Sequence, residues 1–213
     1  LSNPFFAQVY EALAEQAEVK GYAILLGAGQ RSRDREQAIV SGFLSHRVAG
    51  VILVSPRMSA ASIAHLTSGI PAVIVGRDLR VPDVDLITND EGIGVRAAVD
   101  HLVGLGHQDI VHVSGGRGAG AAERRTAYVA AMRAAGLTSR TRVIAGDFTE
   151  HAGQSAAREL LQSRDLPTAV LAANDMVAVG LMGTLESAGV TVPGEVSIVG
   201  YDNLALSELS MIA

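Results

Sequence analysis

Four glycines, at positions 115, 116, 118 and 120, mark the stretch of the chain whose composition most directly suggests chemistry. They lie in "VHVSGGRGAGAAERR" (residues 111–125), between a β-branched run and a segment of helical character. Glycines at such a turn let a phosphate approach the backbone N–H groups at the start of a helix. One hypothesis is therefore a nucleotide site, and the alternative is the lip of another pocket.

The remaining motifs oppose a nucleotide enzyme. The glycine spacing resembles the phosphate turn of short-chain dehydrogenases, but that turn normally follows the first strand of its sheet, whereas several strand–helix pairs precede Gly115. The catalytic Tyr-x-x-x-Lys of those enzymes is missing, because no lysine stands four residues after any tyrosine. No Walker pattern with its lysine occurs either. The glycines are better interpreted as a strand-to-helix loop.

Asn174 and Asp175 follow the apolar run "TAVLAA" and precede a helical segment. Asn and Asp are favoured as helix N-caps. A carboxylate at the end of a strand is also placed to accept hydrogen bonds from paired hydroxyls or ring N–H groups of a ligand. Both roles fit together, with Asn174 as the cap and Asp175 facing a ligand.

Arg124 and three phenylalanines are further candidates for ligand contact. Arg124 stands near the start of a predicted helix, where the helix dipole disfavours a cation. That local conflict indicates a function, although a solvated arginine is the ordinary explanation. Phe5, Phe6 and Phe148 lie at predicted edges, where aromatic faces pack on sugar C–H groups or stack on purines. Core packing is the alternative, and Phe6 lies on the apolar stripe of its helix.

Catalytic and metal-binding patterns are missing from the sequence. The six histidines form no metal pattern, and the chain has no cysteine. No G-x-S-x-G nucleophile motif occurs, and no spacing pairs the carboxylates. We expect no catalytic residue, no metal and no cofactor, and therefore a protein that is not an enzyme.

Short runs rich in Val, Ile and Leu alternate with amphipathic helical segments along the whole chain. This alternation is typical of parallel strands covered by helices on both faces, which predicts an α/β fold. The segment 77–92 ("RDLRVPDVDLITNDEG") breaks the rhythm, and the series is long for one sheet. We therefore expect two doubly wound parallel-sheet lobes with a central cleft. Strands are predicted at residues 22–27, 49–55, 71–76, 85–88, 109–114, 141–146, 168–173 and 195–203.

Composition limits the partners of the chain. Its 213 residues are 48% hydrophobic and 18% charged, which suits a globular core. The formal charge of −5 argues against binding of nucleic acid by this chain alone, since such binding rests on Lys and Arg. No apolar stretch reaches the roughly 18 residues of a membrane helix, so no membrane partner is expected.

Six segments resemble the effector-binding region of LacI/GalR-family transcriptional regulators. They occur in the family's order and cover almost the whole chain, and "GHQDI" and "VPGEVSIVGYDN" are fairly specific. Together they separate this family from its relatives, the periplasmic sugar-binding proteins. The segments are "LSNPFFAQVYEALAEQAEVKGYAILL", "HRVAGVILVSP", "GIPAVIVGR", "HLVGLGHQDIVHVSG", "GDFTEHAGQSAARELL" and "TAVLAANDMVAVGLMGTLESAGVTVPGEVSIVGYDN".

The resemblance implies a type I periplasmic-binding fold with the effector in the cleft. By this likeness the N-terminal lobe spans residues 1–90 and the C-terminal lobe residues 91–205, and the tail returns to the first lobe near 206–213. A helix-turn-helix domain and a first core strand are expected ahead of Leu1, and a further strand after Ala213. The whole regulator is expected to be cytoplasmic.

Effector contacts also follow from the resemblance. Arg124 matches the arginine of the family's R-x-x-G-F, although Ala127 and Tyr128 replace Gly and Phe. Arg117 is expected to reach the cleft from the glycine-rich loop, whose glycines would shape an effector pocket. The implied effector-binding residues are Phe5, Phe6, Arg77, Arg117, Arg124, Phe148, Asp175 and Asp202.

The function implied is allosteric control of operator DNA, in a repressor, by a small polar effector that is sugar-like or purine-like. A homodimer is expected, with contacts on the helices around residues 35–46 and 176–188. A transport receptor for sugars is the competing class, and a dehydrogenase is a distant third.

Overall fold

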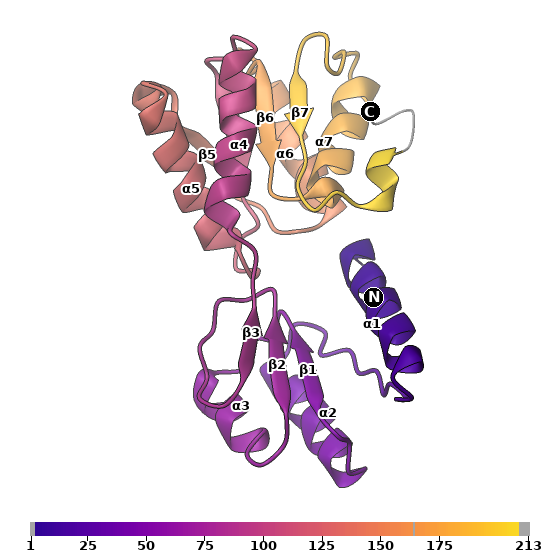
Figure 1. The fold of residues 1–213 in the computed structure, drawn as a ribbon. Coiled ribbons are helices and arrows are strands. Elements are labelled where there is room, and N and C mark those ends of the chain that lie inside the picture. Colours follow the sequence, from indigo (N-terminus) through magenta and orange to yellow (C-terminus); the bar gives the residue numbers. More distant parts are fainter. Residues whose placement is uncertain (1–2, 164, 209–213) are drawn as a thin grey trace. The chain divides into compact units, whose positions relative to one another are not determined.

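The computed structural model describes residues 3–163 and 165–208, and the chain divides into two compact units, residues 1–89 and 90–213. Both units are α/β, and every strand pairing in them is parallel (Figure 1). The fold class predicted from the sequence is confirmed. In chain order the elements are α1 (Pro4–Val19), α2 (Arg33–Ser45), β1 (Val51–Val54), α3 (Ala60–Leu66), β2 (Ala72–Val75), β3 (Asp85–Ile87), α4 (Glu91–Gly104), β4 (Ile110–Val113), α5 (Ala121–Ala134), η1 (Thr138–Arg140), β5 (Arg142–Ile144), α6 (Glu150–Gln162), β6 (Ala169–Ala172), α7 (Asp175–Ser187), β7 (Ser197–Val199) and η2 (Ala205–Glu208).

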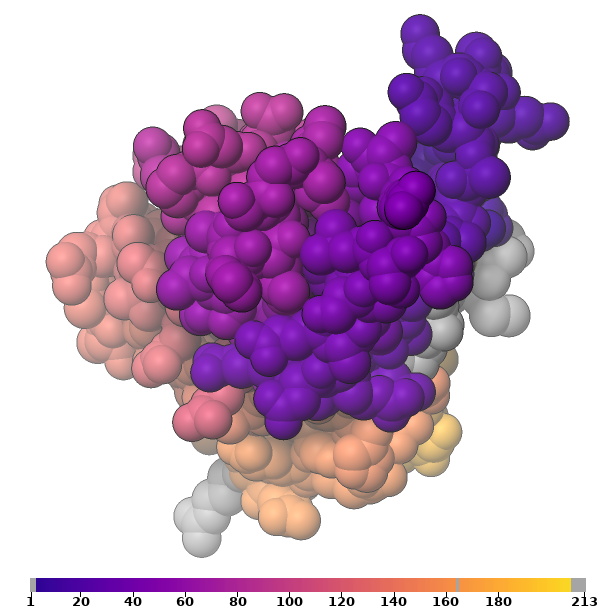
Figure 2. All heavy atoms as spheres, turned by 90° about the horizontal axis from the view of Figure 1, so that it is seen from below, coloured from indigo at the N-terminus to yellow at the C-terminus, as the bar shows by residue number. Residues whose placement is uncertain are grey.

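The 1–89 unit, indigo to purple in Figures 1 and 2, contains a sheet of order β1-β2-β3. Alternate strand residues point to opposite faces. Leu53 of β1 and Ile74 of β2 therefore share one face, where they pack with Val40 of α2 and Ile63 of α3. On the opposite face Ile52 is 48% exposed. None of the residues of α1, which the structure describes throughout, is buried.

The predicted strand at residues 22–27 is wrong. These residues, all described, form no strand, and Tyr22 and Leu26 are 63% and 56% exposed. An apolar run becomes a strand only when a neighbouring strand takes up its backbone N–H and C=O groups. Among the described residues β1 is an edge strand bonded to β2 alone, and the run pairs neither with its free edge nor with another strand.

The 90–213 unit contains a sheet of order β5-β4-β6-β7. Its central strands β4 and β6 are buried along their whole length, as the continuous apolar runs predict. Val111 and Val170 pack against α6 and α7 on one face. Ile110 and Leu171 pack against α4 and α5 on the other. The sheet is thus doubly wound, and its loops at the carboxyl ends of the strands lie at one edge.

Helices α6 and α7 pack through glycines. A Cβ at Gly180 would overlap the backbone carbonyl of Glu150, and one at Gly153 would overlap that of Val177. Gly183, one helical turn after Gly180 in α7, has open space instead. The close approach of these helices therefore depends on particular glycines and not on glycine content in general.

The return of the tail to the first lobe was expected over residues 206–213, of which 209–213 lie outside the described residues. Within the described part of the chain, none of the helices combines the length and apolar character needed to cross a bilayer.

Candidate functional site

Five side chains meet at the carboxyl-end edge of the second sheet, a group we name the carboxyl-end cluster: Glu91, Arg124, Asp175, Tyr201 and Asp202. Glu91 begins α4 and Arg124 lies in the first turn of α5, while the other three follow β6 and β7. Parallel strands bring the loops at their carboxyl ends to one place, where α/β proteins bind ligands. Three of the predicted contacts, Arg124, Asp175 and Asp202, are therefore brought together, and a fourth, Phe148, packs on Arg124.

Arg124 lies at the centre of the cluster and is only 6% exposed. Its Nε–H donates to Oε2 of Glu91 at 2.8 Å, and Nη2 donates to Oε1 of the same carboxylate at 3.4 Å. Nη1 donates to the carbonyl of Ala173 at 2.5 Å and to Oδ1 of Asp202 at 3.5 Å. The cation that the helix dipole disfavours is thus held by carboxylates from two other segments.

Aromatic rings cover the guanidinium. Its Cζ lies 3.7 Å from the centroid of the Tyr201 ring and 5.4 Å from that of Phe148. Burial and a hydrogen bond to Glu91 raise the pKa of Tyr201 to about 12, so the phenol stays neutral. Gly94 makes room for the phenol, because a Cβ there would lie 2.5 Å from its oxygen.

Asn174 and Asp175 divide the two roles expected of them. Asn174 caps α7, since its Oδ1 accepts from the N–H of Val177 at 3.0 Å, and that prediction is confirmed. Asp175 accepts from the N–H of Leu204 at 2.7 Å through Oδ2. Burial raises the pKa of Asp175, while bonds to backbone N–H groups and the charge of Arg124 oppose the rise. Its contact with a ligand stays a prediction.

Asp202 is the most perturbed carboxylate of the cluster. Its backbone φ of 108° lies in a region that non-glycine residues rarely adopt. Burial raises the pKa of Asp202 to about 6, and the nearby Asp175 and Glu91 add to the rise against the opposing charge of Arg124. A strained backbone and a raised pKa at one position are more typical of a functional site than of a solvated loop.

Replacing Asp202 with Asn is expected to stabilise the protein by about 1–2 kcal/mol at pH 8. The folded-state pKa of about 6 lies above the ordinary value, so stability is lost as the pH rises and the carboxylate ionises. Asn cannot ionise and tolerates positive φ. Urea unfolding at pH 8 and pH 4 measures the difference, which should vanish at the lower pH. A difference independent of pH would contradict the reasoning.

The glycine-rich loop is shaped around Phe148. A Cβ at Gly115 or Gly118 would overlap the Phe148 ring, and Gly116 has a φ of 65°. Gly120 is left-handed, with a φ of 77°, where α5 begins. These glycines therefore seat an aromatic side chain and a turn, which accounts for the burst without a phosphate.

The other predicted contacts lie elsewhere. Arg117 is on the same loop with an exposed side chain. Arg77 belongs to the 1–89 unit, where Nη1 donates to the carbonyls of Pro56 at 2.6 Å and Met58 at 3.0 Å. Phe5 and Phe6, also in that unit, are half-buried and pack edge to face at the start of α1. Their contact with an effector stays a prediction.

Glu91 and Tyr201 are the cluster residues that sequence reasoning missed. Glu91 looks like an ordinary acidic residue in a first helical turn, where the dipole favours it. Tyr201 stands in the "GYDN" motif beside Asp202, so the motif held the signal for it. Glu91 is 33 positions from Arg124, a separation that no local pattern spans.

His112 of β4 is buried beside the cluster but serves the core. Its Nδ1 donates to the carbonyl of Leu171 at 3.0 Å, and its ring lies 5.2 Å from that of Tyr128. Burial lowers the pKa of His112 to about 4, so the imidazole is neutral near pH 7. It adds no charge to the site.

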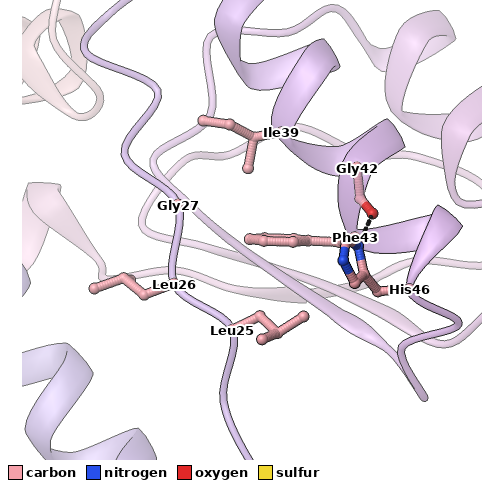
Figure 3. A pocket seen from close by; sticks show the side chains of 7 residues that line it. All are labelled: Leu25, Leu26, Gly27, Ile39, Gly42, Phe43 and His46. Carbon is pink, nitrogen blue, oxygen red and sulfur yellow. Dashed lines mark hydrogen bonds between the residues drawn. The ribbon is translucent and has the colours of Figure 1, made fainter.

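A hollow of about 380 Å³ lies on the 1–89 unit, and none of the predicted effector contacts lines it. Figure 3 shows Ile39 and Phe43 of α2 on one side of it and Leu25 and Leu26 on the other. His46 closes one end, with Nδ1 donating to the carbonyl of Gly42 at 2.8 Å. The hollow is mainly apolar, unlike the carboxyl-end cluster.

The family model and the relatives found by comparison with known proteins point to one protein family. The family model for "Periplasmic binding proteins and sugar binding domain of LacI family" matches residues 1–213. Among curated relatives, the HTH-type transcriptional regulator GalR of Escherichia coli (strain K12) is 30% identical over 97% of this chain and 61% of its own length. The HTH-type transcriptional repressor PurR of Photobacterium profundum is 30% identical over 97% and 63%. The chain thus spans about three fifths of their length.

Solved structures agree. The crystal structure of a LacI transcriptional regulator from Rhodococcus species has a TM-score of 0.93 and 34% identity, over 100% of this chain and 79% of that one. A LacI-family regulator from Enterococcus faecium with bound ribose has a TM-score of 0.87 and 25% identity, over 98% and 76%. One from Lactobacillus casei with bound glucose has a TM-score of 0.84 and 26% identity, over 97% and 79%.

Proposed function

The chain belongs to the family of periplasmic binding proteins and LacI-type sugar-binding domains, and from this premise we propose that it is the effector-sensing domain of a LacI-type repressor. The observation that carries the proposal is the carboxyl-end cluster, which gathers Arg124, Asp175 and Asp202 where α/β sheets bind small molecules. A neutral sugar is the proposed effector, supported by the relatives that bind ribose and glucose.

The proposed mechanism is allosteric. An effector that binds one arrangement of the two units more tightly than the other shifts the population toward it. A DNA-binding domain in the rest of the regulator would respond through its fit to the operator. The competing proposal, a transport receptor, gains no support from the curated relatives above, which are named as transcriptional regulators.

Exposed apolar side chains support the proposed homodimer. Leu25 and Leu26 are 52% and 56% exposed beside α2, one of the helices for which a dimer contact is predicted. Apolar clusters of this kind commonly mark interaction surfaces. Sedimentation equilibrium is expected to show a concentration-dependent dimer that Leu26→Glu weakens. A monomer at every concentration, in both proteins, would contradict the proposal.

Asp175→Asn is expected to weaken effector binding at least about tenfold, because an amide loses the charge-assisted hydrogen bond to a ligand hydroxyl. The thermal shift of the wild-type chain with ribose, glucose, sucrose and adenine identifies a ligand, since binding to the folded state raises the melting temperature. Calorimetry with that ligand then compares the variants. Asp100→Asn on the exposed side of α4 is the control and should bind like the wild type. Equal affinity in Asp175→Asn would remove Asp175 from the site.

A further inference from the structure

We propose that Glu91 fixes the charge class of the ligand: by occupying Arg124, it makes the site accept uncharged polyols and reject anions such as sugar phosphates. This inference rests on the proposed function, since it concerns the ligand of the same site. The residue types of the cluster alone would suggest the opposite preference, because an arginine at a ligand site ordinarily attracts anions.

Most of the N–H groups of Arg124 already donate hydrogen bonds within the protein. A guanidinium has five N–H groups. Four are engaged by Glu91, by the carbonyl of Ala173 and by Asp202. At most one, on Nη2, lacks a bond to a described residue. Anions bind arginine best through two parallel N–H groups, and Glu91 occupies the Nε/Nη2 pair that offers this geometry.

The negative charge of the carboxylates around Arg124 also exceeds its single positive charge. Glu91 and Asp202 lie within ion-pairing distance of it, at 2.8 Å and 3.5 Å, and their side chains are 13% and 11% exposed. Asp175, itself buried, adds a third carboxylate at the same edge of the sheet. With all groups ionised, one cation faces three anions in a poorly hydrated site, where charges are only weakly screened. A phosphate would add repulsion, and Arg124, the cation of the carboxyl-end cluster, is already paired.

The fold holds Glu91 in this position. Asp90 caps α4, its Oδ1 accepting from the N–H of Ile93 at 3.0 Å, which fixes the first turn where Glu91 stands. The Tyr201 ring packs on Arg124 from one face while its hydroxyl reaches Glu91. Glu91 is therefore a positioning residue, which acts on the ligand through Arg124.

The test uses inorganic phosphate as probe and the Nε–Hε resonance of Arg124 as readout in ¹⁵N NMR, assigned with Arg124→Lys. The wild-type chain should show no saturable shift in the millimolar range. Glu91→Ala frees the Nε/Nη2 edge and opens a carboxylate-sized space, so its phosphate affinity should rise at least about tenfold. Glu91→Gln, which removes the charge and keeps the volume, should give a smaller gain and still tests the idea if Glu91→Ala fails to fold.

Glu123→Ala is the matched control, because Glu123 is exposed and adjacent to Arg124. It should behave like the wild type. Saturable phosphate binding at Arg124 in the wild type would overturn the proposal. So would the lack of any gain in the folded Glu91 variants, or an equal gain in Glu123→Ala.

A second arm separates this inference from the proposed function. Calorimetry compares ribose with ribose 5-phosphate in the wild type and in Glu91→Ala. The wild type should prefer ribose, and the variant should lose that preference. Tighter binding of the phosphate by the wild type would overturn the role of Glu91. If neither sugar binds, the ribose form of the proposed function fails, and the phosphate titration still decides on Glu91.

Discussion

Replacing Arg124 with Ala is expected to lower the free energy of unfolding of the 90–213 unit by about 3–5 kcal/mol at pH 7. The substitution leaves Glu91, Asp175 and Asp202 close together without their shared cation. Removing one partner of a buried ion pair costs more than the pair itself contributes, because the other charges stay desolvated. Urea unfolding followed by circular dichroism measures the loss.

The pH dependence identifies the cause. Without Arg124 the pKa values of Asp175 and Asp202 rise further, so protonation of these two carboxylates as the pH falls from 7 to 5 should restore part of the stability. Arg125→Ala is the control, since Arg125 is exposed and its removal should change stability by less than about 0.5 kcal/mol. Equal effects of the two substitutions, or a loss that grows at pH 5, would contradict the role of the cluster.

Gly180→Ala is expected to lower the free energy of unfolding of the 90–213 unit by about 3 kcal/mol. The new Cβ would meet the backbone of Glu150 and Gln154 in α6, and backbone atoms cannot rotate away as a side chain can. Helices α6 and α7 would have to separate, which loosens the core around Leu181. Thermal and urea unfolding should both record the change.

Gly183→Ala is the matched control in the same helix. Nothing lies within 4 Å of the Cβ that it would add. Because Ala is the better helix former, this substitution should stabilise the protein by about 0.5–1 kcal/mol. Opposite signs at positions 180 and 183 are the expected pattern. Two similar changes would mean that helix propensity, and not packing, governs the pair.

The secondary structure could be predicted from the sequence where the residues of a single segment are enough to determine it. The apolar run at Ile110–Val113 reads as a buried parallel strand, and Asn174 before a helical segment reads as a cap; the structure has both. Residues 22–27 show the limit of such reasoning. Their apolar run has the composition of a strand, but a strand also needs a partner, and composition does not say whether one is present.

The site could be predicted in part for the same reason. Arg124 could be identified as a candidate from the sequence because a cation near the start of a helix is disfavoured by the helix dipole, which is a local property. Its partners Glu91 and Asp202 are 33 and 78 positions away, so their pairing is a property of the tertiary fold. The glycine-rich loop was compatible with a phosphate because glycines indicate that a neighbouring group comes close, but not which group it is. In the structure that group is the Phe148 ring.

The contact between Phe148 and the glycines links positions that must change in a fixed order during evolution. A side chain at position 115 or 118 has no volume available while the ring is present. A lineage that acquires one must first replace Phe148 with something smaller, since the reverse order passes through an overpacked intermediate. In an alignment of related chains, residues larger than glycine at 115 or 118 should therefore covary with the loss of the aromatic ring at 148.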